Sequence, residues 1–460
     1  MVFQTVSDIT QLQNVINIAP HNSTILIQDG TYTITSIIKI LNSGIVLKPQ
    51  TSGGVIFTGG NVSFNITGNN NILDGIQFIN TSSNMSSVGG SNFNSYDLIS
   101  VSGNNNTISN ININNVYAHH FINIYGKTQN NHIIYCNIQN KPMDNSQCLG
   151  SMIQIQGDSV IVGNHKIQLC TFRGMTQGTG GDYGCEPIRI GDSQYSTCNI
   201  STTVEYCVFD NTHLADSETI SVKSMYNIIR YNTFSNNPNS YVSYRNGNNN
   251  VCYGNFFLNS SGIRVKQASN ISIYNNYFYN CSPPITFINM TGLYPNLSIY
   301  QNGINMQNNT FYNCSSLSYG TRQTSNNTIA NNIFYQTSNN VNMITGNLTD
   351  FQCLANYYFG NIGTTLSGFT NLDPKLALNN YGYFSILQNS PVIGKSVYTG
   401  LPPLLSLPNL DTDSSLALDI TGNIRVTPKD VGCKQILTKM NFLPINIPLS
   451  VSIIGPSYLQ

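Results

Sequence analysis

The stretch NIIRYNTF at residues 227–234 returns as NVCYGNFF at residues 250–257 and as NISIYNNYF at residues 270–278. Each copy begins with Asn and ends on Phe, with mostly apolar residues between them. The closing Phe residues follow one another at steps of 25, 23 and 21 residues, from Phe209 through Phe234 and Phe257 to Phe278. A period of about 20 to 25 residues built from short strands is typical of a solenoid. Weaker copies end at Phe78, Ile113, Ile138, Phe172, Phe209, Phe311 and Phe334.

The repeat predicts an all-β fold, a right-handed parallel β-helix. Strand-sized runs such as residues 228–231 alternate in and out, as a coil with one buried face requires. Asn between the strands tolerates the left-handed backbone conformation and can hydrogen-bond to the same Asn on the next coil. Leucine-rich repeats have a similar period, but they need Leu where this chain has Ile, Val and Phe.

Both ends of a solenoid must be covered. Asp8, followed by apolar residues at helical spacing as far as Ile18, predicts a short N-terminal capping helix with Asp8 as its N-cap. The repeat fades beyond about Asn389 into Pro-rich sequence. The predicted parts are therefore a β-helix with its cap at 1–395, a closing segment on the last coils at 396–436, and an apolar Pro-rich tail at 437–460.

Charged residues make up only 8 % of the 460 residues, far below the usual quarter, and 19 basic and 19 acidic residues give a net charge of +0. A nucleic-acid-binding protein normally has a basic excess, so we expect no nucleic-acid partner. No apolar run reaches the roughly 18 to 20 residues that span a membrane. No signal peptide is recognisable. We expect a place outside the cell or on a particle such as a virion, and the apolar tail predicts a self-assembly or partner contact.

The 11 cysteines fall into different contexts. Cys281 and Cys314 both lie in the sequence FYNCS, which predicts equivalent, buried positions on different coils. Cys185 and Cys198 flank one loop and are the best candidates for a disulfide.

The scarce charges gather between Glu186 and Lys266. Lys223 and Arg245 are 22 residues apart, and Arg245 and Lys266 are 21 apart, so each step is about one coil. These three cations are predicted to stack on one face, about 4.8 Å apart. Like charges at such spacing repel, so an anionic sugar chain along the face is the natural counter-charge. The alternative, in which they lie apart on solvated loops, stays open.

An acidic pair precedes the first of these cations. Asp216 and Glu218 are two residues apart and would share one face of a strand. Carboxylate oxygens suit a hard cation, so we predict Ca²⁺ as a cofactor at this pair. A simple surface ion-pair cluster is the alternative.

The segments ETISVKS at residues 218–224 and RNGN at 245–248 resemble the core signature of polysaccharide lyase family 6, which includes alginate lyases and chondroitinase B. DGTY at 29–32 and EPIRIG at 186–191 extend the resemblance, which covers most of residues 1–435. Its most specific part is the spacing of five from Glu218 to Lys223, with Arg one coil later.

The resemblance implies β-elimination at a uronic acid of an alginate-like or dermatan- or chondroitin-like polysaccharide. Ca²⁺ would neutralise the uronate carboxylate and stabilise an enolate-like transition state. Asp182 competes with Glu186 as the third metal ligand. The roles that the resemblance implies are Lys223 as the base, Arg245 as the group that stabilises or protonates the leaving side, Glu186, Asp216 and Glu218 as metal ligands, and Arg189, Arg264 and Lys266 as substrate-binding residues.

Two other functions compete. A pectin hydrolase on the same fold would need paired catalytic aspartates and a Gly-His-Gly segment, and the sequence contains neither. A catalytically silent glycan-binding or structural β-helix of a virion or cell surface is the second alternative. A scaffold has no use for the set of Glu218, Lys223 and Arg245, which favours an enzyme.

Overall fold

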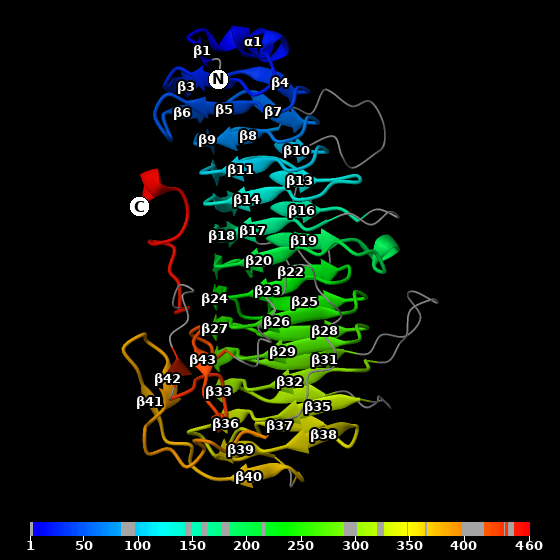
Figure 1. Cartoon of the computed structure of the whole chain (residues 1–460), viewed down its shortest axis with the longest axis vertical. Helices are drawn as coiled ribbons and strands as arrows, with labels where there is room; N and C mark the ends of the chain where they lie inside the picture. The colour runs from blue at the N-terminus through cyan, green and yellow to red at the C-terminus, as the bar shows by residue number, and fades with distance from the viewer. Residues whose placement is uncertain are drawn as a thin grey trace. The chain divides into compact units, whose positions relative to one another are not determined.

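The computed structural model describes residues 3–83, 97–142, 150–157, 163–175, 185–213, 217–288, 301–319, 326–346, 348–363, 366–397, 418–436, 438–439 and 446–460. The chain divides into two compact units. Unit 1 consists of Met1–Ser221 and Ser450–Gln460, and unit 2 of Val222–Leu449. Each unit contains three parallel sheets, here named A, B and C, to which successive coils add one short strand each (Figure 1). These sheets confirm the predicted parallel β-helix.

The strands of unit 1 follow one another in the order A, B, C along most of its coils, and neighbours within a sheet are hydrogen-bonded. Sheet A consists of β1 (Phe3–Val6), β2 (Thr24–Ile27), β5 (Val46–Pro49), β8 (Ile72–Asp74), β11 (Thr107–Ser109), β14 (His132–Ile134), β17 (Lys166–Gln168) and β20 (Thr203–Glu205). Sheet B consists of β3 (Gly30–Tyr32), β6 (Val55–Phe57), β9 (Ile76–Ile79), β12 (Asn112–Asn114), β15 (Asn137–Lys141), β18 (Thr171–Met175) and β21 (Val208–Asp210). Sheet C consists of β4 (Thr35–Ile40), β7 (Asn61–Ile66), β10 (Ile99–Val101), β13 (Ile122–Ile124), β16 (Ile153–Ile155), β19 (Ile188–Gly191) and the first residues of β22 (Glu218–Lys223).

Unit 2 repeats this arrangement. Sheet A consists of β23 (Ile228–Arg230), β26 (Asn250–Tyr253), β29 (Ile271–Tyr274), β32 (Asn305–Gln307), β35 (Asn327–Ala330) and β38 (Phe351–Leu354). Sheet B consists of β24 (Thr233–Ser235), β27 (Phe256–Leu258), β30 (Tyr277–Tyr279), β33 (Thr310–Tyr312), β36 (Ile333–Tyr335), β39 (Asn356–Phe359) and β40 (Phe369–Asn371). Sheet C consists of the end of β22 and of β25 (Tyr241–Arg245), β28 (Ile263–Lys266), β31 (Ile285–Ile288), β34 (Leu317–Tyr319) and β37 (Ile344–Gly346).

Rows of equivalent side chains fill the interior of each unit. In sheet B of unit 2 the repeat phenylalanines lie opposite one another in register and their rings stack 4.7–4.8 Å apart. In unit 1, Phe172 and Phe209 stack in the same way, 4.7 Å apart. The sequence repeat therefore marks one interior position of each coil. The unit 2 row consists of Phe234, Phe257, Phe278, Phe311 and Phe334.

Asparagines form a second kind of row, at the corners between strands. In unit 2 the backbone N–H of every Asn in the row except the last donates to the side-chain Oδ1 of the equivalent Asn one coil later, at 2.9–3.1 Å. These bonds satisfy backbone groups at positions where no strand continues. Many other corner asparagines have a positive φ, such as Asn105 at 55° and Asn130 at 57°, in agreement with the predicted role of Asn. The unit 2 row consists of Asn232, Asn255, Asn276, Asn309, Asn332 and Asn356.

The first coil of unit 1 is covered by a short helix, as predicted. Asp8 accepts a hydrogen bond from the backbone of Thr10 and begins the 3₁₀ turn η1 (Ile9–Gln11), which continues into α1 (Leu12–Ile18). α1 is the single α-helix among the described residues, and it lies over the N-terminal coil beside β1 and β4 (Figure 1). Leu12 and Ile16 are its buried side chains.

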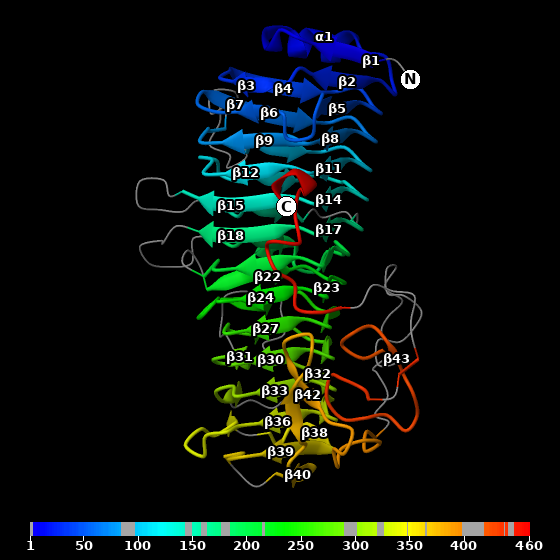
Figure 2. The same cartoon turned by 90° about the vertical axis from the view of Figure 1, so that its left-hand side faces the viewer.

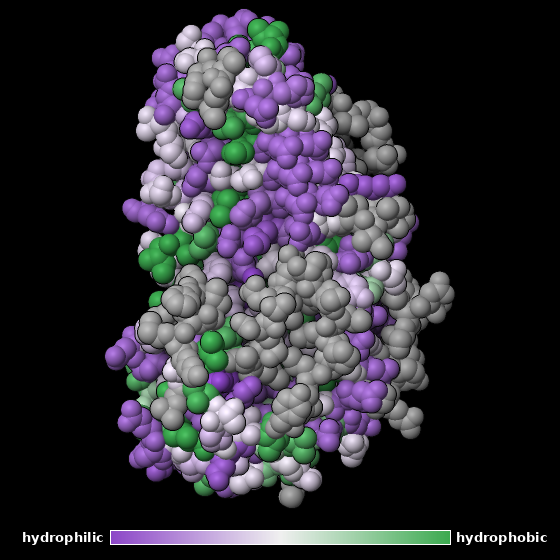
Figure 3. Space-filling model, in the orientation of Figure 1, coloured by the Kyte–Doolittle hydropathy of each residue, from purple (hydrophilic) through white to green (hydrophobic). Residues whose placement is uncertain are grey.

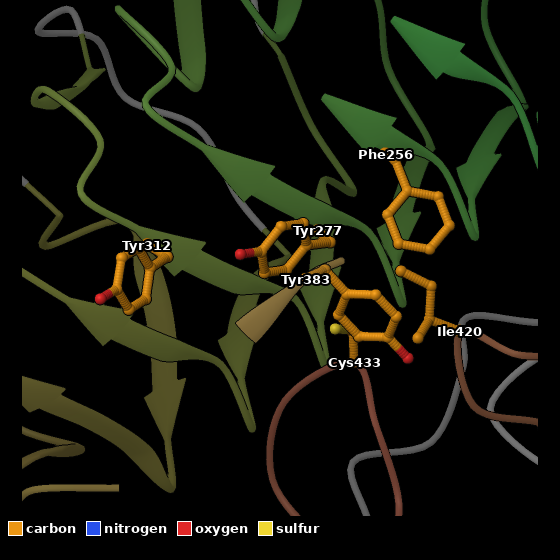
Figure 4. Close-up of a cluster of buried hydrophobic side chains, with 6 residues drawn as sticks. All are labelled: Phe256, Tyr277, Tyr312, Tyr383, Ile420 and Cys433. Atoms are coloured by element: carbon orange, nitrogen blue, oxygen red, sulfur yellow. The ribbon is translucent and has the colours of Figure 1, made fainter. Parts of the chain in front are cut away.

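Segments after the last coil of unit 2 pack on the outer face of its sheet B. The hairpin of β41 (Leu376–Leu378) and β42 (Phe384–Ile386) brings Tyr383 against Phe256 and Tyr277. Figure 4 shows this cluster, in which Ile420 and Cys433 also lie against the rings. A second hairpin pairs β43 (Ile424–Arg425) with β44 (Thr438–Lys439).

The described part of the tail packs against its own chain. In unit 1 the C-terminal end lies beside the coils (Figure 2). There Tyr458, in the 3₁₀ turn η3 (Ser457–Leu459), donates its hydroxyl proton to the backbone oxygen of Asn110 at 2.8 Å. In unit 2, the Asn446 side chain donates to the backbone oxygens of Gly254 and Ile420. The contact with a partner that we predicted for the tail stays a prediction.

The cysteines confirm one prediction and correct another. Cys281 and Cys314 are both buried, and their thiols donate to the backbone oxygens of Phe257 and Phe278, which are register partners, so they occupy equivalent positions. No disulfide joins Cys185 and Cys198, so the disulfide predicted between them is wrong. The two cysteines are close in sequence, on either side of η2 (Ser193–Tyr195), but this closeness does not lead to a disulfide.

The face of unit 1 that Figure 3 turns to the viewer is mainly hydrophilic. Because only 8 % of the residues are charged, neutral polar side chains must supply most of that surface. Among the described residues, no helix is long and apolar enough to cross a membrane.

His165 offers a test of the corner rows. In unit 1 the backbone N–H groups of Asn71 and Asn106 donate to the next Asn, and that of Asn131 donates to His165 Nδ1 at 3.2 Å. Burial lowers the pKa of His165 to about 4 from 6.5, so the folded chain favours the neutral ring. This shift contributes up to about 3 kcal/mol to the free energy of unfolding. The contribution is fully present above pH 6.5 and is lost as the pH falls toward 4, because the unfolded chain then binds a proton that the folded chain does not.

We therefore expect His165→Asn to reduce the fall of the melting temperature between pH 7 and pH 4.5, because Asn keeps the acceptor and does not titrate. Thermal unfolding at both pH values measures this. The exposed His21, changed to Asn, is the matched control and should leave the fall unchanged. An equal fall in wild type and His165→Asn would contradict the prediction.

Candidate functional site

The three cations that were predicted to stack are each the last residue of a strand of sheet C in unit 2. Arg245 is the last residue of β25 and lies opposite Lys266, the last residue of β28, in the parallel register. Lys223 is the last residue of β22, the neighbour of β25 in this sheet. All three side chains are partly exposed. Successive residues of a strand point to opposite faces. Arg245 and Lys266 therefore point away from the face that holds their buried neighbours Tyr244 and Val265.

Arg264 lies on the same outer face, and contacts from the preceding strand orient it. Its Nε donates to Ser243 Oγ at 3.1 Å, and Ser243 is its register partner in β25. Its guanidinium carbon lies over the Tyr241 ring, 4.9 Å from the ring centre. The side chain is 8 % exposed. A hydroxyl and an aromatic face therefore help to hold the guanidinium plane.

Glu186 and Arg189 form an ion pair in unit 1. Glu186 is 1 % exposed and lies two residues before β19, the strand that contains Arg189. Arg189 donates to Glu186 Oε2 from Nη2 at 2.9 Å and from Nε at 3.3 Å. The outer face of sheet C continues along this unit as a row of polar residues, since Arg189 lies opposite Gln154 and Gln154 opposite Asn123.

The predicted metal ligands are described only in part. Glu218 begins β22 and is 1 % exposed. Asp216 and Asp182 lie outside the described residues. Glu186 and Glu218 are buried carboxylates that belong to unit 1, and their oxygens are the ligands that Ca²⁺ takes. Their chemistry suits such a cation, although the Arg189 guanidinium already neutralises Glu186. Within the described ranges, no group of three or more acidic, His or Cys side chains gathers as a metal site.

Sequence reasoning missed the polar groups around the turn before β13. Asp97 accepts a hydrogen bond from His120 Nδ1 at 2.8 Å, and both side chains are buried. Lys141, 1 % exposed, lies with its ammonium group over the Phe121 ring at 4.5 Å. Tyr241 was missed as well. Their spacing follows the register of the coils, since Asp97 and His120 are separated by the same step as the partners Ile99 and Ile122, so the period could have paired these two once they were singled out.

The chain matches one protein family along most of its described coils. A family model described as Chondroitinase B matches residues 6–320. Among curated proteins, no sequence matches this chain.

Solved structures share the fold. The PL6 family alginate lyase AlyGC superposes with a TM-score of 0.73 at 20 % identity, covering 88 % of this chain and 57 % of that one. A mannuronic acid specific family 6 lyase from human gut microbiota gives 0.67 at 21 % identity, covering 81 % and 91 %. A PL6 alginate lyase in complex with a trisaccharide gives 0.66 at 16 % identity, covering 85 % and 92 %. This chain thus spans less than two thirds of the length of AlyGC.

The Glu186–Arg189 pair makes a prediction about stability. Removing the guanidinium by Arg189→Met leaves a buried carboxylate without this cation, so we expect the free energy of unfolding to fall by about 2 kcal/mol. The double variant Glu186→Gln with Arg189→Met should recover part of the loss, because it removes the buried charge too. Melting temperatures of the three proteins measure both effects.

A similar pair serves as the control. Lys166, whose side chain is 40 % exposed, lies 3.4 Å from the buried Glu205. Gln168 also donates to Glu205 at 3.0 Å, so Lys166→Met should cost less than Arg189→Met. A double variant no more stable than Arg189→Met would show that the buried charge of Glu186 is not what the guanidinium offsets.

Proposed function

Because this chain belongs to the chondroitinase B family within polysaccharide lyase family 6, we propose that it cleaves a uronic-acid-containing polysaccharide by β-elimination. The proposed substrate is alginate-like, or like dermatan or chondroitin sulfate. Its chemical class follows from the family and from the cations of sheet C. Of the relatives named above, AlyGC is an alginate lyase, the gut-microbiota enzyme is specific for mannuronic acid, and the family model bears the name of chondroitinase B.

One observation supports the proposal most directly. In a chain with 8 % charged residues, Arg245 and Lys266 end register-paired positions of sheet C, and Lys223 ends the neighbouring strand. Partly exposed cations at the spacing of successive strands favour an extended polyanion, because such a ligand carries negative charges along its length. A uronate polymer carries one carboxylate on each uronic acid residue and meets this requirement.

In the proposed mechanism, Lys223 is the base. Its neutral amine takes the proton from C5 of the uronate, and the electron pair forms a double bond between C4 and C5. The bond from C4 to the glycosidic oxygen breaks, and the Arg245 guanidinium supplies the proton that this oxygen takes up as it leaves. General-base catalysis by a positioned side chain contributes about 10²- to 10⁴-fold.

Carboxylates of unit 1 are proposed to hold Ca²⁺. Asp216, Glu218 and Glu186 would supply the ligands, and the bound ion would neutralise the substrate carboxylate and so acidify the C5 proton. Burial of Glu186 and Glu218 supports this role, because a buried carboxylate needs a cation or hydrogen bonds beside it. Arg189 supplies that cation to Glu186 when no metal is bound.

The proposed substrate-binding residues are Arg189, Arg264 and Lys266. Arginine binds carboxylates through a planar fork of N–H groups, so an oriented guanidinium selects them better than a mobile one. The contacts of Arg264 with Ser243 and Tyr241 support this role. The place of action would be outside the cell or on a particle surface, where such polymers occur. A catalytically silent glycan-binding β-helix is the alternative.

Lyase activity has a direct assay. We expect wild type to raise the ultraviolet absorbance of unsaturated uronates with alginate or dermatan sulfate, and Lys223→Ala to slow that rise at least 100-fold. Lys39, an exposed lysine of β4, is the control, and Lys39→Ala should keep full activity. A silent scaffold gives no signal from wild type, and a different base leaves Lys223→Ala active.

Calcium binding has a readout independent of activity. Ca²⁺ should raise the melting temperature of the wild-type chain, because it binds the folded protein. Glu218→Gln should abolish the rise, while Glu205→Gln, which changes a buried glutamate of sheet A, should keep it. A chelator should slow cleavage by wild type. A melting temperature independent of Ca²⁺ would refute the metal site.

A further inference from the structure

The first coil of unit 1 and the last coil of unit 2 differ in how their edges are covered. In unit 1, the helix α1 lies beside β1, β2 and β4 and covers the first coil. In unit 2, β40 (Phe369–Asn371) is the last strand of sheet B, and within the described ranges no further strand pairs with it (Figure 1). The backbone groups on an uncovered strand edge are a template for pairing with another chain.

The hydrogen bonds of this coil show which backbone groups of β40 remain without a partner. Gly368 and Leu372, on either side of the strand, both bond to the backbone of β39 at 2.9 Å. In a parallel pair, alternate residues direct both backbone groups toward the same neighbour, so Thr370 also faces β39. Phe369 and Asn371 therefore direct their N–H and C=O groups away from β39, and no partner for these four groups lies among the described residues.

Side chains at this edge leave apolar surface exposed. Phe369 packs on Phe334 with ring centres 5.7 Å apart, but its ring is only half-buried. Leu372 follows the strand and is 37 % exposed, and Phe359, at the end of β39, is 39 % exposed. Backbone groups without partners beside exposed apolar side chains are typical of a surface that pairs with another protein chain.

The groups at this edge are complementary to themselves. Two copies of β40, placed antiparallel about a two-fold axis at Thr370, bring Phe369 of each copy opposite Asn371 of the other. Residues opposite each other in this way exchange two N–H···O bonds, so the two pairs use all four outward groups of each copy. The same register places Leu372 opposite Gly368, which has no side chain. An antiparallel strand at the edge of a parallel sheet is a common arrangement.

Charge does not oppose association of two copies. The chain has 19 basic and 19 acidic residues and a net charge of +0, and proteins with a net charge near zero associate more readily than highly charged ones. A contact about a two-fold axis is also closed, so assembly through it stops at the dimer.

We propose that the open edge of β40 is a dimer interface, through which two copies of this chain join by antiparallel pairing of their β40 strands. The interface concerns assembly and does not depend on lyase activity. It is separate from the contact predicted for the tail at 437–460, because it uses the last coil of sheet B.

Thr370→Lys tests the interface. Thr370 is exposed, and at the two-fold axis the two lysines would lie directly opposite each other, where like charges destabilise strand pairing. Sedimentation equilibrium over a range of protein concentrations should give twice the mass of one chain for wild type and the mass of one chain for Thr370→Lys. Thr31, exposed at the middle of β3, the first strand of sheet B, is the matched control, and Thr31→Lys should keep the dimer.

Asn371→Pro is a second variant that acts on the backbone. Proline is tolerated on an edge strand where its missing N–H points away from the sheet, so each folded chain keeps its own hydrogen bonds. In the dimer the change removes one donor from each copy, and we expect the dimer to be lost. Melting temperatures of the variants show whether each chain folds. Hydrogen exchange gives an independent measurement, since the amides of Phe369 and Asn371 should exchange more slowly in wild type than in Thr370→Lys.

Three outcomes overturn the interface. The first is a wild-type chain that stays monomeric at every concentration. The second is a dimer that neither Thr370→Lys nor Asn371→Pro weakens, because another surface then holds it. The third is an open-ended assembly, which a closed two-fold contact does not form.

Discussion

Hydrogen bonds between successive coils are the constraint on which every other feature of this chain depends. They join strand to strand in each sheet and continue through the corners, where Asn309 donates to Asn332 and Asn332 to Asn356. Because each bond fixes the register of one coil on the next, an outward residue has a known neighbour about 4.8 Å away. Arg245 meets Lys266 for this reason alone, since no direct contact holds two cations together.

Register survives large differences in coil length. Phe278 follows Phe257 by 21 residues and Phe311 follows Phe278 by 33, yet each pair of rings stacks 4.8 Å apart. Extra residues therefore leave the coil at its corners and do not shift the strands. Loops can lengthen beside sheet C while the strands that carry the cations stay in place. Scaffold and site are in this sense independent, which is the physical basis for varied substrates on one fold.

The sequence predicts those rows of residues that recur at the same position of successive coils. The Phe repeat marks one interior row, and the equal contexts of Cys281 and Cys314 mark another. The step of 21 residues predicts the Arg245–Lys266 pair because one short coil separates them. Other contacts between neighbouring coils were missed although they follow the same register: Asp97 and His120 are as far apart in sequence as the partners Ile99 and Ile122, and Tyr241 lies two residues before the partner of Arg264. The period says which positions are neighbours, but it does not say which polar side chains there are in contact. The expected disulfide failed because nearness in sequence says little about nearness across a corner.

The few charges of the chain serve two physical purposes. Buried ones hold irregular backbone: Lys141 binds two backbone oxygens of one turn, and Arg425, 5 % exposed, donates to the backbone oxygens of Leu418, Asp430 and Gly432. A cation is suited to this task, because one side chain can satisfy several oxygens that no strand would satisfy. The cations at the strand ends of sheet C are more exposed and hold no such segment together by any contact described above. Arg245 and Lys266 lie on the outer face of the sheet, where the charge of each is partly exposed to solvent.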